Sequence, residues 1–138
     1  MDDTKREWVR SWLIKAHSDL RSAHALVALS EPATDTAIYH CQQAAEKALK
    51  GYLAFRDQPL ERTHDLERLL ELATALDSTF APLETPADVL NPYATAFRYP
   101  DTLGVQFPSV AEVITAIEHA QAIYDFVLKM LPAEVRPD

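Results

Sequence analysis

The sequence contains very little glycine and cysteine. Only two glycines occur among its 138 residues, and no convincing run alternates apolar with polar residues. Because hairpins and tight turns rely on glycine, these absences argue against a β-sheet protein. The single cysteine, Cys41, excludes a disulfide within the chain and a zinc site built from several cysteines. We therefore expect an all-α fold with a buried free thiol.

Long apolar runs and an excess of basic residues are also missing. No apolar run approaches the ~20 residues of a membrane-spanning helix, and the first residues, MDDTKREW, do not resemble a secretory signal peptide. These features predict a cytoplasmic protein. The formal net charge of −8 argues against sequence-independent nucleic-acid binding, which needs a broadly basic surface. A local basic patch is still compatible with this charge.

Apolar periodicity predicts a single helical domain over residues 1–138. Helices are expected over residues 4–29 and 35–55, where apolar residues recur at helical spacing. A third helix is expected after Thr63 as its N-cap, with Asp65 in the first turn. Together with two later helices, these segments predict an up-and-down bundle of four long helices and one shorter helix.

The shorter helix and the last long helix are expected in the second half of the chain. Thr85 has the features of an N-cap before proline and predicts a helix toward Phe97, kinked near Pro92. The last helix is expected to begin at Ser109, with Glu112 completing a capping box. Its inward face is predicted from apolar residues at helical spacing: Val110, Val113, Ile114, Ile117, Tyr124, Leu128 and Leu131.

The segment YHCQQAAEKALKGY, residues 39–52, combines an apolar face with a polar stripe. The apolar face consists of Ile38, Cys41, Ala45, Ala48, Leu49 and Tyr52. The stripe on the opposite face consists of His40, Gln43, Lys47 and Lys50. One imidazole, one amide and two ammonium groups suit an anionic ligand or an acidic partner. The alternative is an ordinary solvated helix face, on which Glu46 and Lys50 form an ion pair.

Three separated motifs follow one another along the chain. They are QQAAEKALKGYL in the second predicted helix, THDL at the start of the third, and Tyr93 followed by RYPD. Together they resemble the HEPN family (higher eukaryotes and prokaryotes nucleotide-binding), and the resemblance covers nearly the whole chain. It implies a five-helix bundle, usually a homodimer, often paired with a minimal nucleotidyltransferase in toxin–antitoxin or defence settings. Two tryptophans in the first predicted helix offer an apolar surface for such a dimer.

Several branches of the family are metal-independent ribonucleases, with an arginine followed four to six residues later by a histidine. Arg98 resembles the family arginine, but YPD follows it, and the next histidine is His119. The motif is therefore not intact, and we favour a binding module over an enzyme. In a ribonuclease, Arg98 would stabilise the transferring phosphate, and His40 or His64 would have to supply the missing base.

Arg98 is the leading candidate for a ligand-binding residue. Its guanidinium is always charged and matches phosphate or carboxylate groups with two N–H donors. Asp101 could instead hold it in a salt bridge. Phe97 and Tyr99 are candidates to stack on a nucleotide base, with a place in the core as the alternative. Tyr99 is also a candidate for nucleotidylation by a partner.

The remaining histidines allow several interpretations. His64 follows the predicted N-cap, where the helix dipole favours the neutral ring, so it could transfer a proton. Alternatively, its ring binds a loop carbonyl and fixes the turn. Arg10 and His17 match an R-x6-H spacing on the first helix, where the family does not carry its motif, so we interpret them as surface residues. No two histidines have the spacing of a helical metal site, so neither a metal nor a cofactor is expected.

These patterns predict a HEPN-type module that forms a homodimer and binds a nucleotide, a nucleotidyltransferase partner, or both. In a nucleotide complex, Lys47, Lys50 and Arg98 would bind the phosphates, and Gln43 with an aromatic residue would bind the base. A third alternative is a structural scaffold that buries the polar stripe of residues 39–52 against a partner. The candidate ligand-binding residues are His40, Gln43, Lys47, Lys50, Arg98, Tyr99 and His64.

Overall fold

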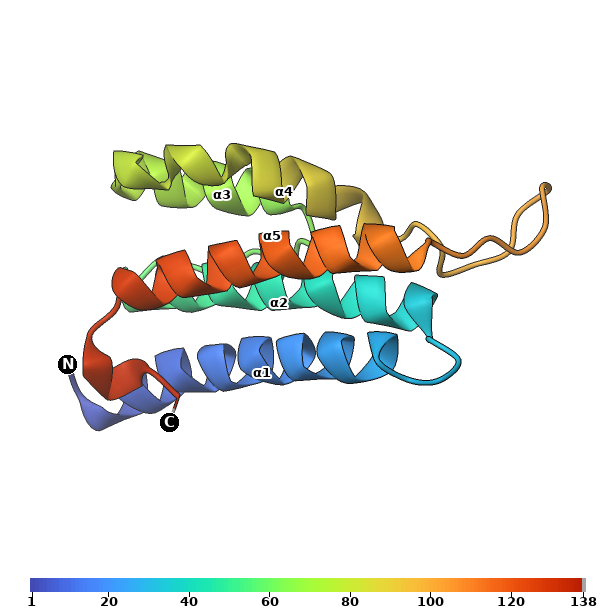
Figure 1. Ribbon diagram of the computed structural model, residues 1–138. Coiled ribbons are helices and arrows are strands. Elements are labelled where there is room, and N and C mark those ends of the chain that lie inside the picture. Colours follow the sequence, from blue (N-terminus) through green and yellow to red (C-terminus); the bar gives the residue numbers. More distant parts are fainter. Residues whose placement is uncertain (138) are drawn as a thin grey trace.

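Three long helices lie side by side, and two shorter ones pack against them (Figure 1). The long helices are α1 (Asp3–Val27), α2 (Thr34–Phe55) and α5 (Val110–Lys129); the shorter ones are α3 (Leu66–Leu76) and α4 (Glu84–Leu90). This computed structural model describes residues 1–137, which contain no β-strand and no helix long and apolar enough to cross a membrane. The predicted all-α bundle of five helices is confirmed, although α3 has only 11 residues.

Helix α2 is the central helix of the bundle. It packs against α1, α5, α3 and α4, and 16 of its 22 residues are buried. The prediction that the polar stripe of α2 lies on the protein surface is therefore wrong, because Gln43 and Lys50 are only 9% and 8% exposed. His40 and Lys47 are half-buried. Periodicity identifies the faces of a helix, but it does not show that neighbouring helices cover both faces.

The N-cap of α3 is Asp65 rather than Thr63. The Asp65 carboxylate accepts hydrogen bonds from the backbone N–H groups two and three positions further on, at 3.0 and 3.4 Å. Thr63 instead accepts a hydrogen bond from the Asp65 N–H at 3.1 Å. Asn91 then joins this helix start to the end of α4, because its amide donates to Asp65 at 3.0 Å and accepts from Leu66 N–H at 2.8 Å.

The expected fourth helix starts earlier and ends sooner than the sequence predicted. A 3-10 turn at Ser78–Leu83 leads into α4, so Thr85 lies inside the helix instead of capping it. Pro86 is tolerated there because the first-turn N–H groups have no partner within a helix. After Leu90, the chain continues as a second 3-10 turn, Asn91–Ala94. Phe97 then adopts a left-handed conformation (φ 67°), where the chain leaves the bundle.

The last helix begins as predicted. Ser109 Oγ accepts from the Glu112 N–H at 3.0 Å, and the Glu112 carboxylate accepts from the Ser109 N–H at 3.4 Å, so the capping box is confirmed. The inward face is only partly right. Val113, Ile117, Tyr124 and Leu131 are buried, but Val110 and Ile114 are 41% and 48% exposed. No neighbouring helix among the described residues covers the side of α5 on which these two residues lie.

Cys41 is fully buried, as its place on the apolar face of α2 predicted. Its thiol donates a weak hydrogen bond to the Ala37 carbonyl, with the sulfur 3.4 Å from the oxygen. Burial raises the pKa of the Cys41 thiol to about 12, because an apolar environment disfavours the thiolate. The group is therefore a packing residue and not a nucleophile.

Candidate anion-binding site

A buried carboxylate on α1 binds two of the predicted site residues. Asp19 is 6% exposed; its Oδ1 lies 2.7 Å from His40 Nδ1, and its Oδ2 accepts from Lys47 Nζ at 2.7 Å. A charge at this depth needs such partners, since burying it unpaired is costly. Sequence reasoning missed Asp19. The available signal was an acidic residue placed among apolar ones, between Ala16 and Ala23 of the first helix.

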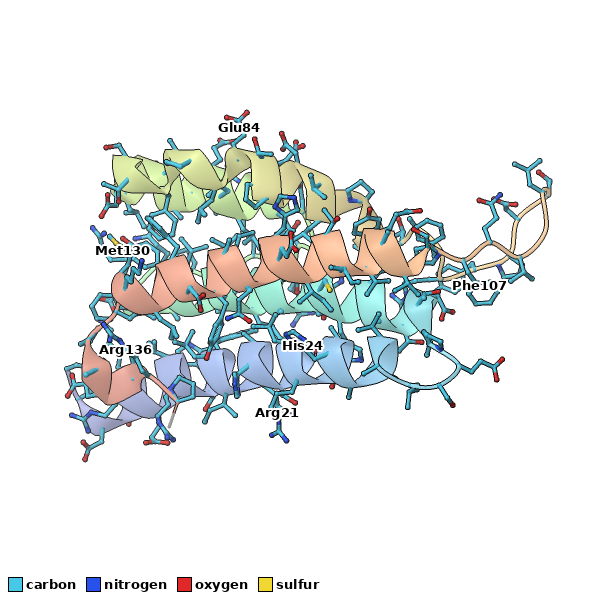
Figure 2. All side chains as sticks on the ribbon, in the orientation of Figure 1. Arg21, His24, Glu84, Phe107, Met130 and Arg136 are labelled. Carbon is cyan, nitrogen blue, oxygen red and sulfur yellow. The ribbon has the colours of Figure 1, made fainter. Side chains whose placement is uncertain are left out.

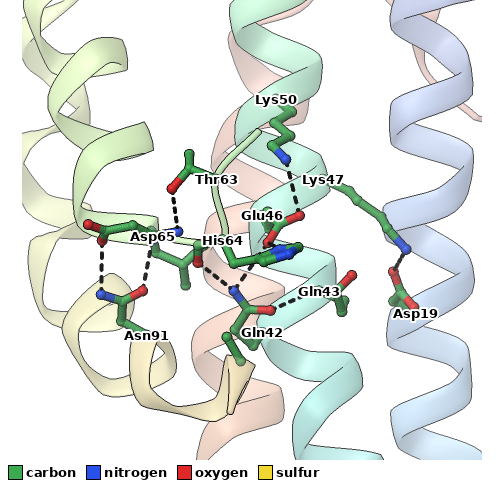
Figure 3. Close-up of polar contacts among 12 residues, drawn as sticks. Asp19, Gln42, Gln43, Glu46, Lys47, Lys50, Thr63, His64, Asp65 and Asn91 are labelled. Carbon is green, nitrogen blue, oxygen red and sulfur yellow. Dashed lines mark hydrogen bonds and ion pairs between the residues drawn. The ribbon is translucent and has the colours of Figure 1, made fainter. Parts of the chain in front are cut away.

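A second buried carboxylate, Glu46, binds two further predicted site residues, His64 and Lys50 (Figure 3). One of its oxygens lies 2.7 Å from His64 Nδ1 and 3.4 Å from the Gln42 amide nitrogen; the other accepts from Lys50 Nζ at 3.3 Å. Lys50 also lies 5.8 Å from the centre of the Trp12 ring. The Glu46–Lys50 pair that the sequence predicted is therefore present, but it is buried, and its lysine does not face solvent.

The two glutamines of the QQ motif hold the loop that precedes α3. Gln42 is fully buried and donates to the backbone carbonyl of His64 at 2.9 Å, while Gln43 donates to the Gln42 side chain at 2.8 Å. One interpretation of the sequence was that the His64 ring binds a loop carbonyl. The ring instead binds Glu46, because this carboxylate lies within reach and is the stronger acceptor. Its side chain remains 71% exposed.

Arg98 lies where the chain leaves the bundle. Its guanidinium carbon is 4.0 Å from the centre of the Tyr39 ring, and one guanidinium N–H donates to the Ala94 carbonyl at 3.4 Å. The alternative salt bridge with Asp101 is absent from the described part of the chain. Asp101 instead accepts from the Leu103 N–H at 2.7 Å and forms an isolated β-bridge with Gly104.

Arg98 and His40 line the same pocket, which has a volume of about 310 Å³. Its other lining residues are Asp35, Thr36 and Tyr39, from the first turns of α2. The tertiary structure thus brings two of the seven predicted site residues together. Tyr99 lies beside this pocket, its ring 5.7 Å from the Arg98 guanidinium, and is 72% exposed. The other four, Gln43, Lys47, Lys50 and His64, do not line it and make the hydrogen bonds and ion pairs described above.

The pocket offers suitable chemistry for one small anionic group. Arg98 supplies a fixed positive charge, and Thr36 supplies a hydroxyl. Because Asp19 occupies Nδ1 of His40, the other ring nitrogen, Nε2, is the one available to a ligand. The pocket also lies at the N-terminal, positive end of α2. The carboxylate of Asp35 would repel a second negatively charged group of a ligand, so the pocket suits a single phosphate or carboxylate.

Two other hollows have different linings. A groove of about 540 Å³ is lined by residues of α3, α4 and the turn between them, including Glu67, Glu71, Glu84 and Asp88, which repel negative charge. A smaller hollow on α1 contains Arg10, His17 and Arg21. There the His17 ring stacks on Tyr124 with ring centres 5.9 Å apart.

The acidic groove leads to a pH-dependent prediction for Glu67. A hydrogen bond with Asp88, and then its negative charge, raise the pKa of Glu67. The folded state therefore binds this proton more tightly than the unfolded state. The resulting stabilisation is complete below the unfolded-state pKa and is lost as pH rises through the raised folded-state pKa. Glu67→Gln is thus expected to raise the melting temperature at neutral pH and to leave it unchanged in acid.

Thermal unfolding followed by circular dichroism at several pH values measures this effect. Glu71→Gln is the matched control, because Glu71 already pairs with Arg68 at 3.2 Å and should gain nothing from neutralisation. A Glu67→Gln variant less stable than the wild type at neutral pH would contradict the prediction.

The helical bundle and its motif-bearing α2 define an all-α domain of the HEPN type. The HEPN domain model matches residues 9–131, and the chain belongs to the HEPN family. The resemblance inferred from the sequence is thereby confirmed. The polar cluster around Asp19 and Glu46 thus lies within the matched region, as does the Arg98 pocket.

Two solved structures are similar over most of their length. TT1696 from Thermus thermophilus is 32% identical, with a TM-score of 0.75, covering 89% of this chain and 98% of that one. ST0689, described as an archaeal HEPN homologue, is 27% identical, with a TM-score of 0.70, covering 88% of this chain and 96% of that one. No curated protein matches the chain.

Proposed function

We propose that this HEPN-family chain is a cytoplasmic binding module that holds a phosphate group of a nucleotide in the Arg98 pocket. The observation that carries the proposal is the state of the Arg98 side chain. Its guanidinium is fixed on the Tyr39 ring next to His40, and it makes no ion pair among residues 1–137. An arginine held in place without a carboxylate partner retains its N–H donors for an incoming phosphate.

In this proposal a small set of residues contacts the ligand. Arg98 donates to the phosphate, and His40 binds it through Nε2. Tyr99, exposed beside the pocket, offers a ring on which the base stacks. Lys47 and Lys50, which the sequence assigned to the phosphates, already neutralise Asp19 and Glu46, so they support the pocket indirectly.

Calorimetric titration with ATP, with and without magnesium, tests the proposal. Arg98→Ala is expected to weaken binding about 10- to 100-fold, because hydrogen bonds to charged groups contribute about 1.5–3 kcal/mol. Arg62→Ala is the matched control: it removes the same charge from an exposed residue that does not line the pocket. Undetectable binding at millimolar ATP, or equal losses in both variants, would refute the proposal.

The proposal includes two protein partners that the family implies, a second copy of the chain and a minimal nucleotidyltransferase, in a toxin–antitoxin or defence setting. Family membership supports both. Co-expression with the product of a neighbouring nucleotidyltransferase gene and affinity purification test the second partner. Absence of a stable or covalently modified complex would exclude it. A scaffold that docks through the polar stripe has less support, because that stripe is largely buried within the chain.

A second candidate function is a metal-independent endoribonuclease, and one observation favours it. His40 is oriented by a buried carboxylate and shares a pocket with Arg98, an arrangement suited to a base beside a phosphate clamp. His64 does not line that pocket. RNA cleavage in EDTA should then be lost in Arg98→Ala and His40→Ala and retained in His64→Ala. Equal cleavage by all variants would indicate a contaminant.

A further inference from the structure

A long arm, residues 98–108, projects from the bundle between α4 and α5 and exposes large apolar side chains (Figure 1). Tyr99, Leu103, Val105 and Phe107 are 62–81% exposed. Figure 2 shows Phe107 on this arm, outside the helical layers. Isolated apolar residues are common on protein surfaces, but four within nine residues of one projecting segment are not.

The apolar surface of the arm continues onto the start of α5. Val110 and Ile114, the two residues expected to point inward, are 41% and 48% exposed there. Since an aromatic side chain presents roughly 150–250 Å², Tyr99 and Phe107 alone expose on the order of 250 Å², and the four aliphatic side chains add to this area. The exposed apolar area therefore reaches the ~300–600 Å² of the largest patch on a typical monomer, a substantial part of the ~800 Å² per partner of a stable interface.

The arm also has unused backbone groups. Asp101 and Gly104 pair with each other near its tip, but residues 105–108 make no backbone hydrogen bond within the described part of the chain. An extended segment with free N–H and C=O groups is ready to pair with another strand. In such a strand Val105 and Phe107, two positions apart, would point to the same side.

Charge indicates which partner fits the arm. The chain carries a formal charge of −8, so two copies repel each other over most of their surface. The arm is an exception, because its only charged residues are Arg98 and Asp101, of opposite sign. Two arms can therefore meet without like-charge repulsion. A basic partner would be attracted to the acidic bundle instead.

We propose that the arms of two copies pack against each other about a two-fold axis, with residues 105–107 paired antiparallel. Leu103 and Phe107 of each copy are then buried against the arm and the α5 start of the other. A self-complementary patch of this kind closes after two copies. This inference rests on the homodimer included in the proposed function and assigns the surface that forms it; dimerisation and nucleotide binding are measured separately.

Sedimentation velocity of the full chain over a series of micromolar concentrations tests the arm. The wild type is expected to be a dimer, and Leu103→Ser/Phe107→Ser should weaken dimerisation on the order of a hundredfold, as loss of two central anchors does. Both residues are exposed, so the far-ultraviolet circular dichroism spectrum should keep its helical form. Ile14→Ser/Leu29→Ser, which removes two side chains that are 42% and 51% exposed elsewhere, is the matched control and should remain dimeric.

Hydrogen exchange of the amides of Val105 and Phe107 tests the strand pairing, with slow exchange expected in the wild type and fast exchange in the arm variant. A monomeric wild type would overturn both the homodimer and the arm proposal. A dimer that survives the arm substitutions, or that only the control substitutions dissociate, would overturn the arm proposal alone. ATP titration of the same samples reports separately on the Arg98 pocket.

Discussion

Replacing Glu46 with alanine is expected to destabilise the protein by about 3–5 kcal/mol, the usual cost of removing one partner from a buried ion pair. The Glu46 carboxylate is 4% exposed and is the acceptor that His64, Gln42 and Lys50 share. Its loss leaves the Lys50 ammonium buried without a counter-charge and releases the loop before α3. Urea unfolding followed by circular dichroism measures the change in unfolding free energy.

Two further variants separate the buried pair from an ordinary surface pair. Glu61 and Arg68 form an exposed ion pair at 2.9 Å, so Glu61→Ala should cost far less than Glu46→Ala. Adding Lys50→Met to Glu46→Ala should recover part of the loss, because it removes the unpaired buried cation. If Glu46→Ala costs as little as Glu61→Ala, the buried cluster is not what holds α2 and the α3 loop together.

Replacing Gly51 with valine is expected to cost about 3 kcal/mol through overpacking between α1 and α2. A Cβ atom at this position would lie 2.6 Å from Leu13 Cδ2 and 3.2 Å from Trp12 Cβ. Leu13 is fully buried and cannot move aside freely. Valine adds two more methyl groups to this contact. The midpoint of urea unfolding should fall with little change in slope.

A double-mutant cycle with Leu13→Ala tests this explanation. Alone, Leu13→Ala should cost about 2–5 kcal/mol as a large-to-small core substitution. In the Gly51→Val background its cost should be clearly smaller, because the valine methyl groups fill the space that Leu13 vacates. Additive effects of the two substitutions would show that crowding against Leu13 is not the cause. A Gly51→Val protein as stable as the wild type would refute the prediction itself.

The sequence predicted the helical elements because their signals are local. Scarce glycine and a 3.6-residue apolar period define the long helices, and α1 and α2 start and end within two residues of the expected positions. The capping box of Ser109 is encoded within four consecutive residues, and it is present. Around Thr63 and Thr85, several residues could cap a helix. The contact of Asn91 with Asp65 decided which residue caps α3, and the 3-10 turn before α4 decided where α4 begins.

The candidate site was only half predictable. His40 and Arg98 were both identified, but their proximity depends on the path of the chain over more than fifty residues. Gln43, Lys47 and Lys50 were assigned to a ligand because polar residues opposite an apolar face are ordinarily solvated. The structure instead buries them or pairs them with acidic groups, since α2 is covered on both sides.

The sequence by itself determined the all-α fold, the family, the buried thiol of Cys41 and the main helix limits, because periodicity, capping and motif order act over short stretches of chain. Only the tertiary structure decided what those helices face. It placed Asp19 within hydrogen-bond distance of His40 and Lys47, and Glu46 within hydrogen-bond distance of His64 and Lys50. The physical reason is that a buried charge requires a partner, and that partner comes from whichever segment the packing of helices brings alongside.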